Sequence, residues 1–262
     1  MSGARTQPDD PTSSRICLGD SENISALLMT LLGLDDRSDS AVGAIAMALG
    51  LDVIEGRLAP GADLNSVELA RRFTTSRTPV REALRLLEKE HLVEMPARRR
   101  PRVAPIEAKP AAEIYRVRAA LVGLLSELIC ERVTDDELAE LRERYATMRE
   151  AADAGDVDAY FWANVWFGER TVEIAGDDTL RQILASLGVR VLRLRHLSMS
   201  MPNRLAQSVD DRGRLLRAYE ERDAELAAAL HRSIILGALH ALERFHWGSR
   251  KVPPAIPGGR SA

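Results

Sequence analysis

Three arginines recur at every fourth position of one short segment, at Arg77, Arg81 and Arg85. If that segment is helical, this spacing places the three guanidinium groups in a row along one face. A guanidinium carries a planar fork of N–H donors, which can bind a phosphate or the O6 and N7 atoms of guanine through two hydrogen bonds. Ser76 and Thr78 lie at the start of the segment, where their hydroxyls and the free backbone N–H groups could hold a phosphate. The pattern therefore favours contact with a nucleic acid.

A second interpretation of these arginines is a solvent-exposed charged face. Glu82, Glu88 and Glu90 are near enough in the sequence to form ion pairs with the arginine row. Runs of charged residues on a helix are often only solvated, and the arginines would then bind no ligand. The spacing by itself leaves both interpretations open.

Another basic cluster follows shortly after the row and favours the first interpretation. Four arginines stand among five residues, and a proline between them stiffens the segment. Such a cluster suits contact with phosphates or with a minor groove, although alone it could also be a solvated turn. Its arginines are Arg98, Arg99, Arg100 and Arg102.

The elements that must position these arginines have the pattern of a winged helix-turn-helix. Apolar residues at helical spacing predict a first helix over 42–55. Ser76 is the predicted N-cap of the helix that carries the arginine row, and Pro79 stands in its first turn, where a missing N–H costs nothing. Two short strands, 92–95 and 102–104, enclose the second basic cluster and complete the pattern.

The apolar residues also predict which face of each helix is buried. Asn65 and Glu68 form an N-cap pair that opens a short helix before the arginine helix. In these two helices, the residues predicted to face inward are Val67, Ala70 and Phe73 in the first and Val80, Ala83, Leu84 and Leu87 in the second.

Beyond this domain the pattern is helical almost throughout, so 106–249 is expected to be an all-α bundle of about six helices that serves ligand binding and dimerisation. Residues 1–40 are rich in Asp, Ser, Thr and Pro and are expected to be disordered or weakly helical, with one short helix near 24–32. Residues 250–262 are expected to form a flexible tail. The helices of the bundle are expected near 111–132, 136–154, 157–175, 178–200, 207–222 and 223–248.

Charge is distributed unevenly along the chain. The net charge of the 262 residues is −3, which excludes a basic coat over the whole protein. Residues 41–105, the predicted winged-helix domain, nonetheless carry 11 Lys and Arg against 8 Asp and Glu. Cys17 and Cys130 are too far apart for a CxxC pair, so no disulfide framework or zinc ribbon is expected. The longest apolar run near the N-terminus, 24–34, is too short to cross a bilayer, and a cytoplasmic protein without a membrane partner is expected.

Residues 51–104 resemble the DNA-binding domain of GntR-type bacterial transcription regulators. The helical remainder is similar in length and layout to the FadR-like (FCD) subgroup, whose C-terminal domain is an all-helical effector sensor. Three stretches carry the resemblance, and the last of them is highly specific. They are Ile54-Glu-Gly-Arg-Leu-Ala-Pro-Gly61, Leu64-Asn-Ser-Val-Glu-Leu-Ala70, and Ser76-Arg-Thr-Pro-Val-Arg-Glu-Ala-Leu84 with Leu86-Leu-Glu88 behind it.

The resemblance implies DNA contacts for the arginine helix. Arg77, Thr78 and Arg81 stand at the family's contact positions, with Ser76 beside them. The arginines at the tip of the wing are expected to assist. Double-stranded DNA is therefore the expected partner.

Three positions depart from the family pattern. Val67 stands where some relatives have a polar or basic contact. The tip of the wing has Ala97-Arg98-Arg99 in place of the usual glycine. His91 replaces a common glycine, which predicts strain in the turn before Leu92.

Many FadR-like sensor domains bind a divalent metal through one Asp and three His, and the metal then holds a carboxylate effector. Aligned with that pattern, this chain lacks all four ligands. An amide, a glycine, a guanidinium and an aliphatic chain cannot form a zinc or manganese site, so no metal cofactor is expected. The four positions are Asn164, Gly168, Arg212 and Ile234.

The resemblance also places Arg118 where it would face the sensor cavity. Together with Asn164 and Arg212, it could bind a small-molecule effector such as a carboxylate directly. The alternative is a packed interior in which the two arginines form ion pairs with Glu127, Asp211 or Glu225.

The function expected from these features is a ligand-responsive regulator, most often a repressor in this family. It would bind a short inverted repeat as a homodimer, because one reading helix contacts only a half-site. The alternative is an effector-independent DNA-binding protein whose helical domain only dimerises. An enzyme is not expected, because the sequence has no nucleophile elbow, phosphate loop or HExxH motif.

Overall fold

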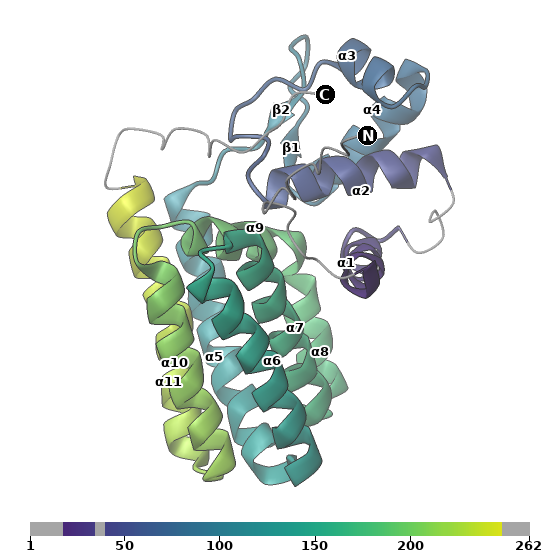
Figure 1. The fold of residues 1–262 in the computed structure, drawn as a ribbon. Coiled ribbons are helices and arrows are strands. Elements are labelled where there is room, and N and C mark those ends of the chain that lie inside the picture. Colours follow the sequence, from purple (N-terminus) through teal and green to yellow (C-terminus); the bar gives the residue numbers. More distant parts are fainter. Residues whose placement is uncertain (1–17, 35–39, 248–262) are drawn as a thin grey trace, which may run out of the picture.

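The computed structural model describes residues 18–34 and 40–247, so the tail expected over 250–262 lies outside the described residues. A small domain of helices and one two-stranded ribbon lies at one end of a bundle of long helices (Figure 1). The predicted fold class is confirmed, because the chain is mainly helical and a winged helix-turn-helix precedes an all-helical domain.

The winged helix-turn-helix has three helices and an antiparallel ribbon. In the ribbon, Val93 pairs with Val103 and Glu94 pairs with Arg102, and the arginine-rich tip lies between the two strands. The bounds of the five elements are α2 (Ala41–Ile54), α3 (Ser66–Arg72), α4 (Arg77–Lys89), β1 (Val93–Glu94) and β2 (Arg102–Val103).

Helix α4 buries the face that its sequence predicts. Burial of four apolar side chains removes a large area from water and holds α4 against α2 and α3. For α3 the prediction is partly wrong: Ala70 is buried, but the Val67 side chain is 47% exposed. The helix is short, and Val67 lies in its first turn on the side of the ribbon. The residues of the α4 stripe, each 0% exposed, are Val80, Ala83, Leu84 and Leu87.

The end of α4 requires a left-handed residue. The N–H of Leu92 donates to the carbonyl of Leu87 and the N–H of His91 donates to the carbonyl of Glu88, which is the Schellman arrangement. His91 therefore has a φ of 58°. This conformation is normally taken by glycine, because a Cβ atom crowds the neighbouring carbonyl. The strain expected at this turn is thus located at the His91 backbone.

Replacing His91 with glycine is expected to raise the free energy of unfolding by about 0.5–1 kcal/mol, because the strain of the left-handed residue is removed. The measurement is a urea titration, in which the midpoint should rise with an unchanged slope. His91→Ala is the matched control, since it also removes the imidazole but keeps the Cβ atom. Equal midpoints for the two variants would contradict the explanation.

The second domain contains seven α-helices within the described residues, followed by a short π-helix. The long helices run roughly alongside one another (Figure 1), and α5 packs along α11. No helix in the described part of the chain is long and apolar enough to span a bilayer. The elements are α5 (Ala108–Arg132), α6 (Asp135–Asp153), α7 (Val157–Ala175), α8 (Asp178–Ser186), α9 (Gly188–Met199), α10 (Arg204–Glu220), α11 (Ala224–Leu242) and the π-helix (Glu243–Trp247).

The expectation of one helix over 178–200 is wrong. The chain breaks at Leu187 and Gly188, and Gly188 has a φ of 55°, which separates α8 from α9. Because of this break, α9 leaves the direction of α8 and lies between the bundle and the winged-helix domain (Figure 1).

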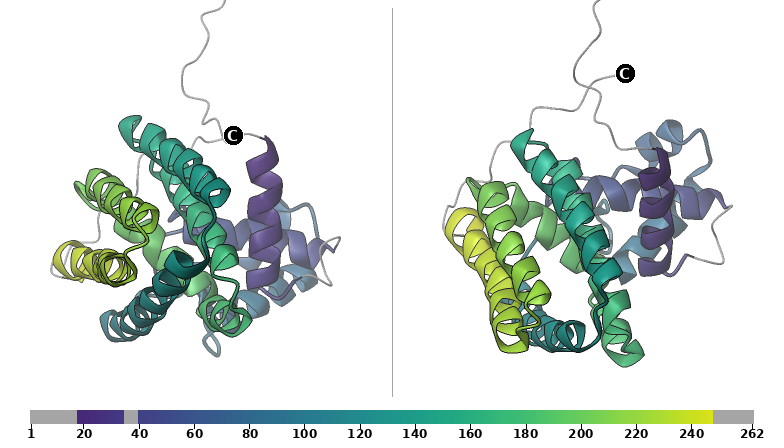
Figure 2. Two further views of the ribbon diagram at one scale, coloured as in Figure 1. Left: turned by 90° about the horizontal axis from the view of Figure 1, so that it is seen from below. Right: turned by 60° about the horizontal axis from the view of Figure 1, so that its bottom comes forward.

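Helix α1 (Leu18–Leu31) lies beside the winged-helix domain, outside the bundle, as Figure 2 shows. The sequence predicts only a short helix near 24–32 in a disordered or weakly helical segment. In the structure Ile24 and Leu28 are buried in the same core as α2 and α4. The apolar face of this helix therefore has a partner, which the composition of residues 1–40 did not indicate.

The two domains share one apolar core. Phe161 and Trp162 of α7 and Leu192 of α9 belong to the cluster of buried residues that fills the winged-helix domain. A polar contact crosses the same interface, because the indole N–H of Trp162 donates to the buried carboxylate of Glu55, 2.8 Å away. The winged-helix domain is thus packed on α7 and α9.

Candidate nucleic-acid interface and buried arginine cluster

A single groove collects the arginines of α4 and of the wing. Arg77, Arg81 and Arg85 line it from α4, and the start of α3 contributes Asn65 and Val67. The α4 arginines are exposed, as expected for side chains on the face opposite the buried stripe. The arginines that line the groove from the wing are Arg98, Arg99, Arg100 and Arg102.

The acidic residues near the row do not neutralise it. Among the described residues, no ion pair joins Arg77, Arg81 or Arg85 to a carboxylate. Glu88 accepts a hydrogen bond from the backbone N–H of Met95, at 3.0 Å. The alternative interpretation, a charged face paired with its acidic neighbours, is therefore not seen in the part of the chain that the structure describes, and the α4 guanidiniums face the groove.

The wing has one internal ion pair and a strained tip. Arg102 lies 2.6 Å from Glu94 across the ribbon, which occupies one of the four arginines. Arg98 has a φ of 62°, at the place where the family pattern has glycine. Arg98, Arg99 and Arg100 are exposed and have no carboxylate partner in the described part of the chain. Three guanidiniums of the tip are thus available to phosphates.

Ser76 and Thr78 lie at the N-terminus of α4. Ser76 has the extended backbone of an N-cap, but its side chain makes no capping hydrogen bond. Both residues are exposed. The first turn of α4 therefore presents two hydroxyls and unpaired backbone N–H groups, which is a suitable site for a phosphate oxygen.

In the bundle, two residues that the sequence places in an effector pocket contact each other. The side-chain oxygen of Asn164 on α7 accepts from Arg212 on α10, at 3.2 Å. It also accepts from Arg195 on α9, at 2.8 Å. Arg118 on α5 is close enough to lower the pKa of Arg195. The structure thus brings Arg118, Asn164 and Arg212 together, and it adds Arg195, which sequence reasoning missed.

The buried arginine cluster, which consists of Asn164 and of Arg118, Arg195, Arg204 and Arg212, carries more positive than negative charge. Arg195, Arg204 and Arg212 are all buried. Burial lowers the pKa of Arg118 to about 10 and that of Arg195 to about 9, because the charged form is desolvated. The carboxylates that act on these arginines are Glu169 and Asp211. Desolvated guanidiniums without matching carboxylates are costly, so the cluster favours an anionic ligand.

Several buried polar atoms of this cluster have no hydrogen-bond partner among the described residues. Buried polar atoms are usually satisfied, by protein or by a bound molecule. Here the unsatisfied atoms belong to two arginine side chains of α10. They are the Nε atoms of Arg204 and Arg212 and Nη1 of Arg212.

The alternative to an effector pocket is a packed interior in which Arg118 and Arg212 form ion pairs, and no such ion pair is seen among the described residues. Glu127 lies 4.0 Å from Arg232 instead. Arg212 stacks on the ring of Phe167, with its guanidinium carbon 5.0 Å from the ring centroid. Arg212 is therefore held by an aromatic face and by Asn164, and its remaining donors are free to bind a ligand.

The four positions that would hold the family's metal do not fit a cation. The Asn164 oxygen already accepts from two guanidiniums, which would repel a metal ion. Gly168 has no side chain, and Arg195 comes within 3.9 Å of the position where its Cβ would lie. Ile234 is aliphatic and buried. Among the described residues, no three His, Cys, Asp or Glu side chains gather into a set that could hold a metal.

Two buried histidines have polar partners that the sequence did not predict. Nδ1 of His231 lies 2.9 Å from the hydroxyl of Ser126. Burial and the nearby arginines hold the pKa of His231 well below its usual value, so this ring is neutral. Nε2 of His196 on α9 lies 2.7 Å from a carboxylate oxygen of Asp158 on α7. These partners are far apart in sequence, and no local spacing indicates them.

The chain matches two family models. Residues 42–103 match the model described as bacterial regulatory proteins, gntR family, and residues 113–236 match the FCD domain. The first match covers α2 to the wing, and the second covers most of the bundle.

Individual relatives agree with these matches. The chain is 27% identical over 176 residues to the uncharacterised HTH-type transcriptional regulator YdhC of Bacillus subtilis strain 168, covering 67% of this chain and 79% of the relative. It is 29% identical over 178 residues to the probable D-xylose utilization operon transcriptional repressor of Paenarthrobacter nicotinovorans, covering 68% and 77%. Among solved structures, Escherichia coli McbR/YncC superposes with a TM-score of 0.65 at 25% identity, covering 78% of this chain and 98% of that one.

Proposed function

Because the chain belongs to the GntR family of transcriptional regulators and carries the FCD domain, we propose that it is a ligand-responsive repressor that binds a short inverted-repeat operator as a homodimer. The observation that carries this proposal is the groove between α4 and the wing, where six of the seven lining arginines have no carboxylate partner among the described residues. In the proposed complex Arg77, Arg81 and Arg85 lie in the major groove. Ser76, Thr78 and the tip of the wing contact phosphates.

A homodimer is supported by the exposed apolar surface of the bundle. Val117 and Leu124 lie seven positions apart on α5, hence on one face, and their side chains are 51% and 46% exposed. A second copy of the chain could cover this face while it places a second α4 on the other half-site. The FCD relatives named above are regulators and not enzymes, which agrees with this role for the bundle.

Selection of bound duplexes from a random pool is the test of the proposed function. The sequence expected to be enriched is a short inverted repeat. The affinity of the protein for it should fall steeply as the salt concentration is raised, because each neutralised phosphate releases counterions. Arg77→Ala should reduce the enrichment. A pool without an enriched sequence, with Arg77→Ala equal to the wild type, would exclude the proposal.

The proposed effector is a small organic anion, such as a carboxylate, bound by the buried arginine cluster. The charge excess of the cluster and its unsatisfied nitrogen atoms on Arg204 and Arg212 support an anion. Effector binding would act by favouring one arrangement of the two winged-helix domains of the dimer over another. An operator affinity that no anion changes would indicate instead an effector-independent protein whose bundle only dimerises.

The cluster is proposed to bind its effector without a metal. Protein purified without a histidine tag should therefore contain well under one zinc, manganese or nickel ion per chain, because guanidiniums surround the only amide oxygen at the family's metal positions. Elemental analysis after dialysis against a chelator is the measurement. A stoichiometric metal that resists the chelator would contradict the proposal.

A further inference from the structure

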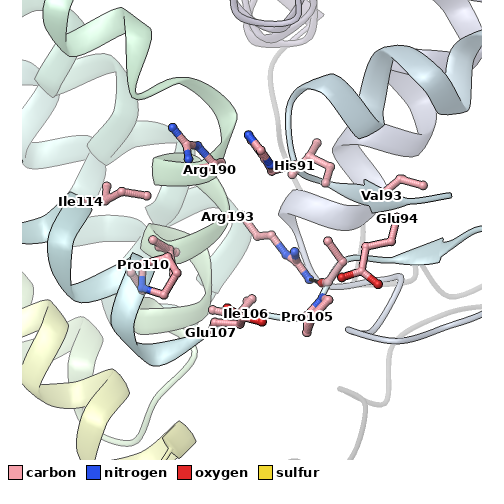
Figure 3. A pocket seen from close by; sticks show the side chains of 14 residues that line it. His91, Val93, Glu94, Pro105, Ile106, Glu107, Pro110, Ile114, Arg190 and Arg193 are labelled. Atoms are coloured by element: carbon pink, nitrogen blue, oxygen red, sulfur yellow. Dashed lines mark hydrogen bonds between the residues drawn. The ribbon is translucent and has the colours of Figure 1, made fainter. Parts of the chain in front are cut away.

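A separate cavity lies between the winged-helix domain and the bundle. Its volume is about 290 Å³, near the lower limit of small-molecule pockets. Residues 92–94 at the base of the wing form one wall, and the linker after β2 with Pro110 and Ile114 of α5 forms another. Figure 3 shows Arg193 of α9 reaching from the bundle side toward the base of the wing. The cavity shares no residue with the buried arginine cluster.

Arg193 is the polar group of this cavity. It is 94% buried, since its exposed fraction is 6%, and no carboxylate pairs with it among the described residues. One of its terminal nitrogens, Nη2, donates to the carbonyl of Ala104 at 2.8 Å. A guanidinium has five donors, so the others are left for a molecule in the cavity. Burial without a counter-ion also lowers its pKa, to about 10.

The other charged groups around the cavity favour an anion over a cation. Arg190 and His91 line it and lie near each other on one side (Figure 3). Glu94 also lines it, but its charge is neutralised by Arg102 at 2.6 Å. Glu107 stands at the exposed start of α5. The buried charge is therefore positive, and the remaining carboxylate is on the exposed side.

The rest of the lining is apolar. Ile106 of the linker and Pro110 and Ile114 of α5 offer aliphatic surface, and Pro105 lies beside Arg193 (Figure 3). A molecule that fits both parts has one anionic group and a short apolar body. A doubly charged acid would leave its second charge against the aliphatic wall, which is unfavourable.

We propose that this interdomain cavity binds a small monocarboxylate, with its carboxylate on Arg193 and Arg190 and its apolar body against Ile106 and Ile114. Its walls belong to both domains, so a bound molecule links the base of the wing to α5 and α9. Binding therefore stabilises one relative position of the domains. Occupation of the site does not require the proposed operator binding.

Calorimetric titration of the full chain with benzoate and hexanoate tests this site. Both are expected to bind saturably, at about one molecule per cavity. Neutral benzamide should bind more weakly by a factor of roughly ten or more, because it lacks the charge. Ile114→Trp should abolish binding, because the indole fills the cavity without touching the Arg193 contact. Arg193→Gln should weaken binding roughly tenfold or more.

Two control variants locate the site. Arg116→Gln removes an exposed arginine of α5 that does not line the cavity, and Arg212→Met changes the buried arginine cluster. Arg116→Gln should bind benzoate like the wild type. Arg212→Met should lose only benzoate that binds in the buried arginine cluster and should still bind it in the interdomain cavity, which Arg212 does not line. The proposal is overturned if neither acid binds saturably, if Ile114→Trp binds as well as the wild type, or if Arg212→Met alone abolishes binding. Benzoate binding that changes no operator affinity would leave the site in place and remove only its regulatory effect.

Discussion

Replacing Arg81 with alanine is expected to lower the affinity for the selected operator by about 1–3 kcal/mol, which is about 5–150-fold in Kd. Arg81 lies between Arg77 and Arg85 in the exposed row of α4 and faces the groove. It has no ion pair in the described part of the chain, so the substitution removes a ligand contact and leaves the internal contacts unchanged. The measurement is fluorescence anisotropy of a labelled duplex at fixed salt.

The salt dependence shows what Arg81 contacts. If it binds a base edge, the slope of affinity against salt should stay the same and discrimination at one position of the operator should weaken. If it binds a phosphate, all duplexes should lose affinity and the slope should fall by about 1. Arg149→Ala, an exposed arginine on α6, is the matched control and should change nothing. An unchanged Kd for Arg81→Ala would remove it from the DNA contacts.

Helix α9 connects the buried arginine cluster to the winged-helix domain. Arg195 of α9 is bonded to Asn164 in the cluster, and Arg193, two residues before it, is bonded to the carbonyl of Ala104 after the wing. Leu192 belongs to the core of the winged-helix domain. An anion that draws Arg195 away from Asn164 therefore acts on the helix that also holds the base of the wing. A rigid helix with contacts at both sites is a physical route for coupling.

The winged-helix domain could be predicted from its sequence because its signals are local. In α4, a buried stripe alternates with arginines, and Ser76 marks the start of the helix. The left-handed residue at His91 also follows from local chemistry, since the Schellman turn fixes its conformation. The sequence predicts the wrong face for Val67, because α3 has too few turns for its apolar residues to define one face.

The buried cluster could be predicted only in part. Arg118, Asn164 and Arg212 came from a family pattern, but Arg195 and Arg204 did not, because a charged residue in an amphipathic helix normally indicates solvent. Their burial depends on how α9 and α10 cross the bundle. The direction of α9 depends in turn on the break between α8 and α9 at Gly188. No proline and no polar N-cap residue at this point of the sequence indicates that a new helix begins. Tertiary packing, and not periodicity, decided these features.

Replacing Arg212 with methionine is expected to abolish stabilisation by the multiply charged anions citrate, malate and phosphate, which the buried arginine cluster is proposed to bind. In the wild type, a bound anion should raise the free energy of unfolding by about 2.7 kcal/mol at a hundredfold excess over Kd. In the variant this gain should disappear, because the guanidinium with two unsatisfied nitrogens is lost. The measurement is thermal unfolding with citrate, malate or phosphate, each against an equal ionic strength of chloride.

The stability of the variant without any anion separates ligand binding from folding. Methionine is similar in length and can still pack on Phe167, and Asn164 keeps its hydrogen bond to Arg195. Since the variant removes a buried charge without a matching carboxylate, its unfolding free energy should be unchanged or higher by about 1–4 kcal/mol. Arg149→Met, on the exposed face of α6, should keep the anion response and the wild-type stability. A strong loss of stability together with an unchanged response to anions would mean that Arg212 supports the fold and binds no effector.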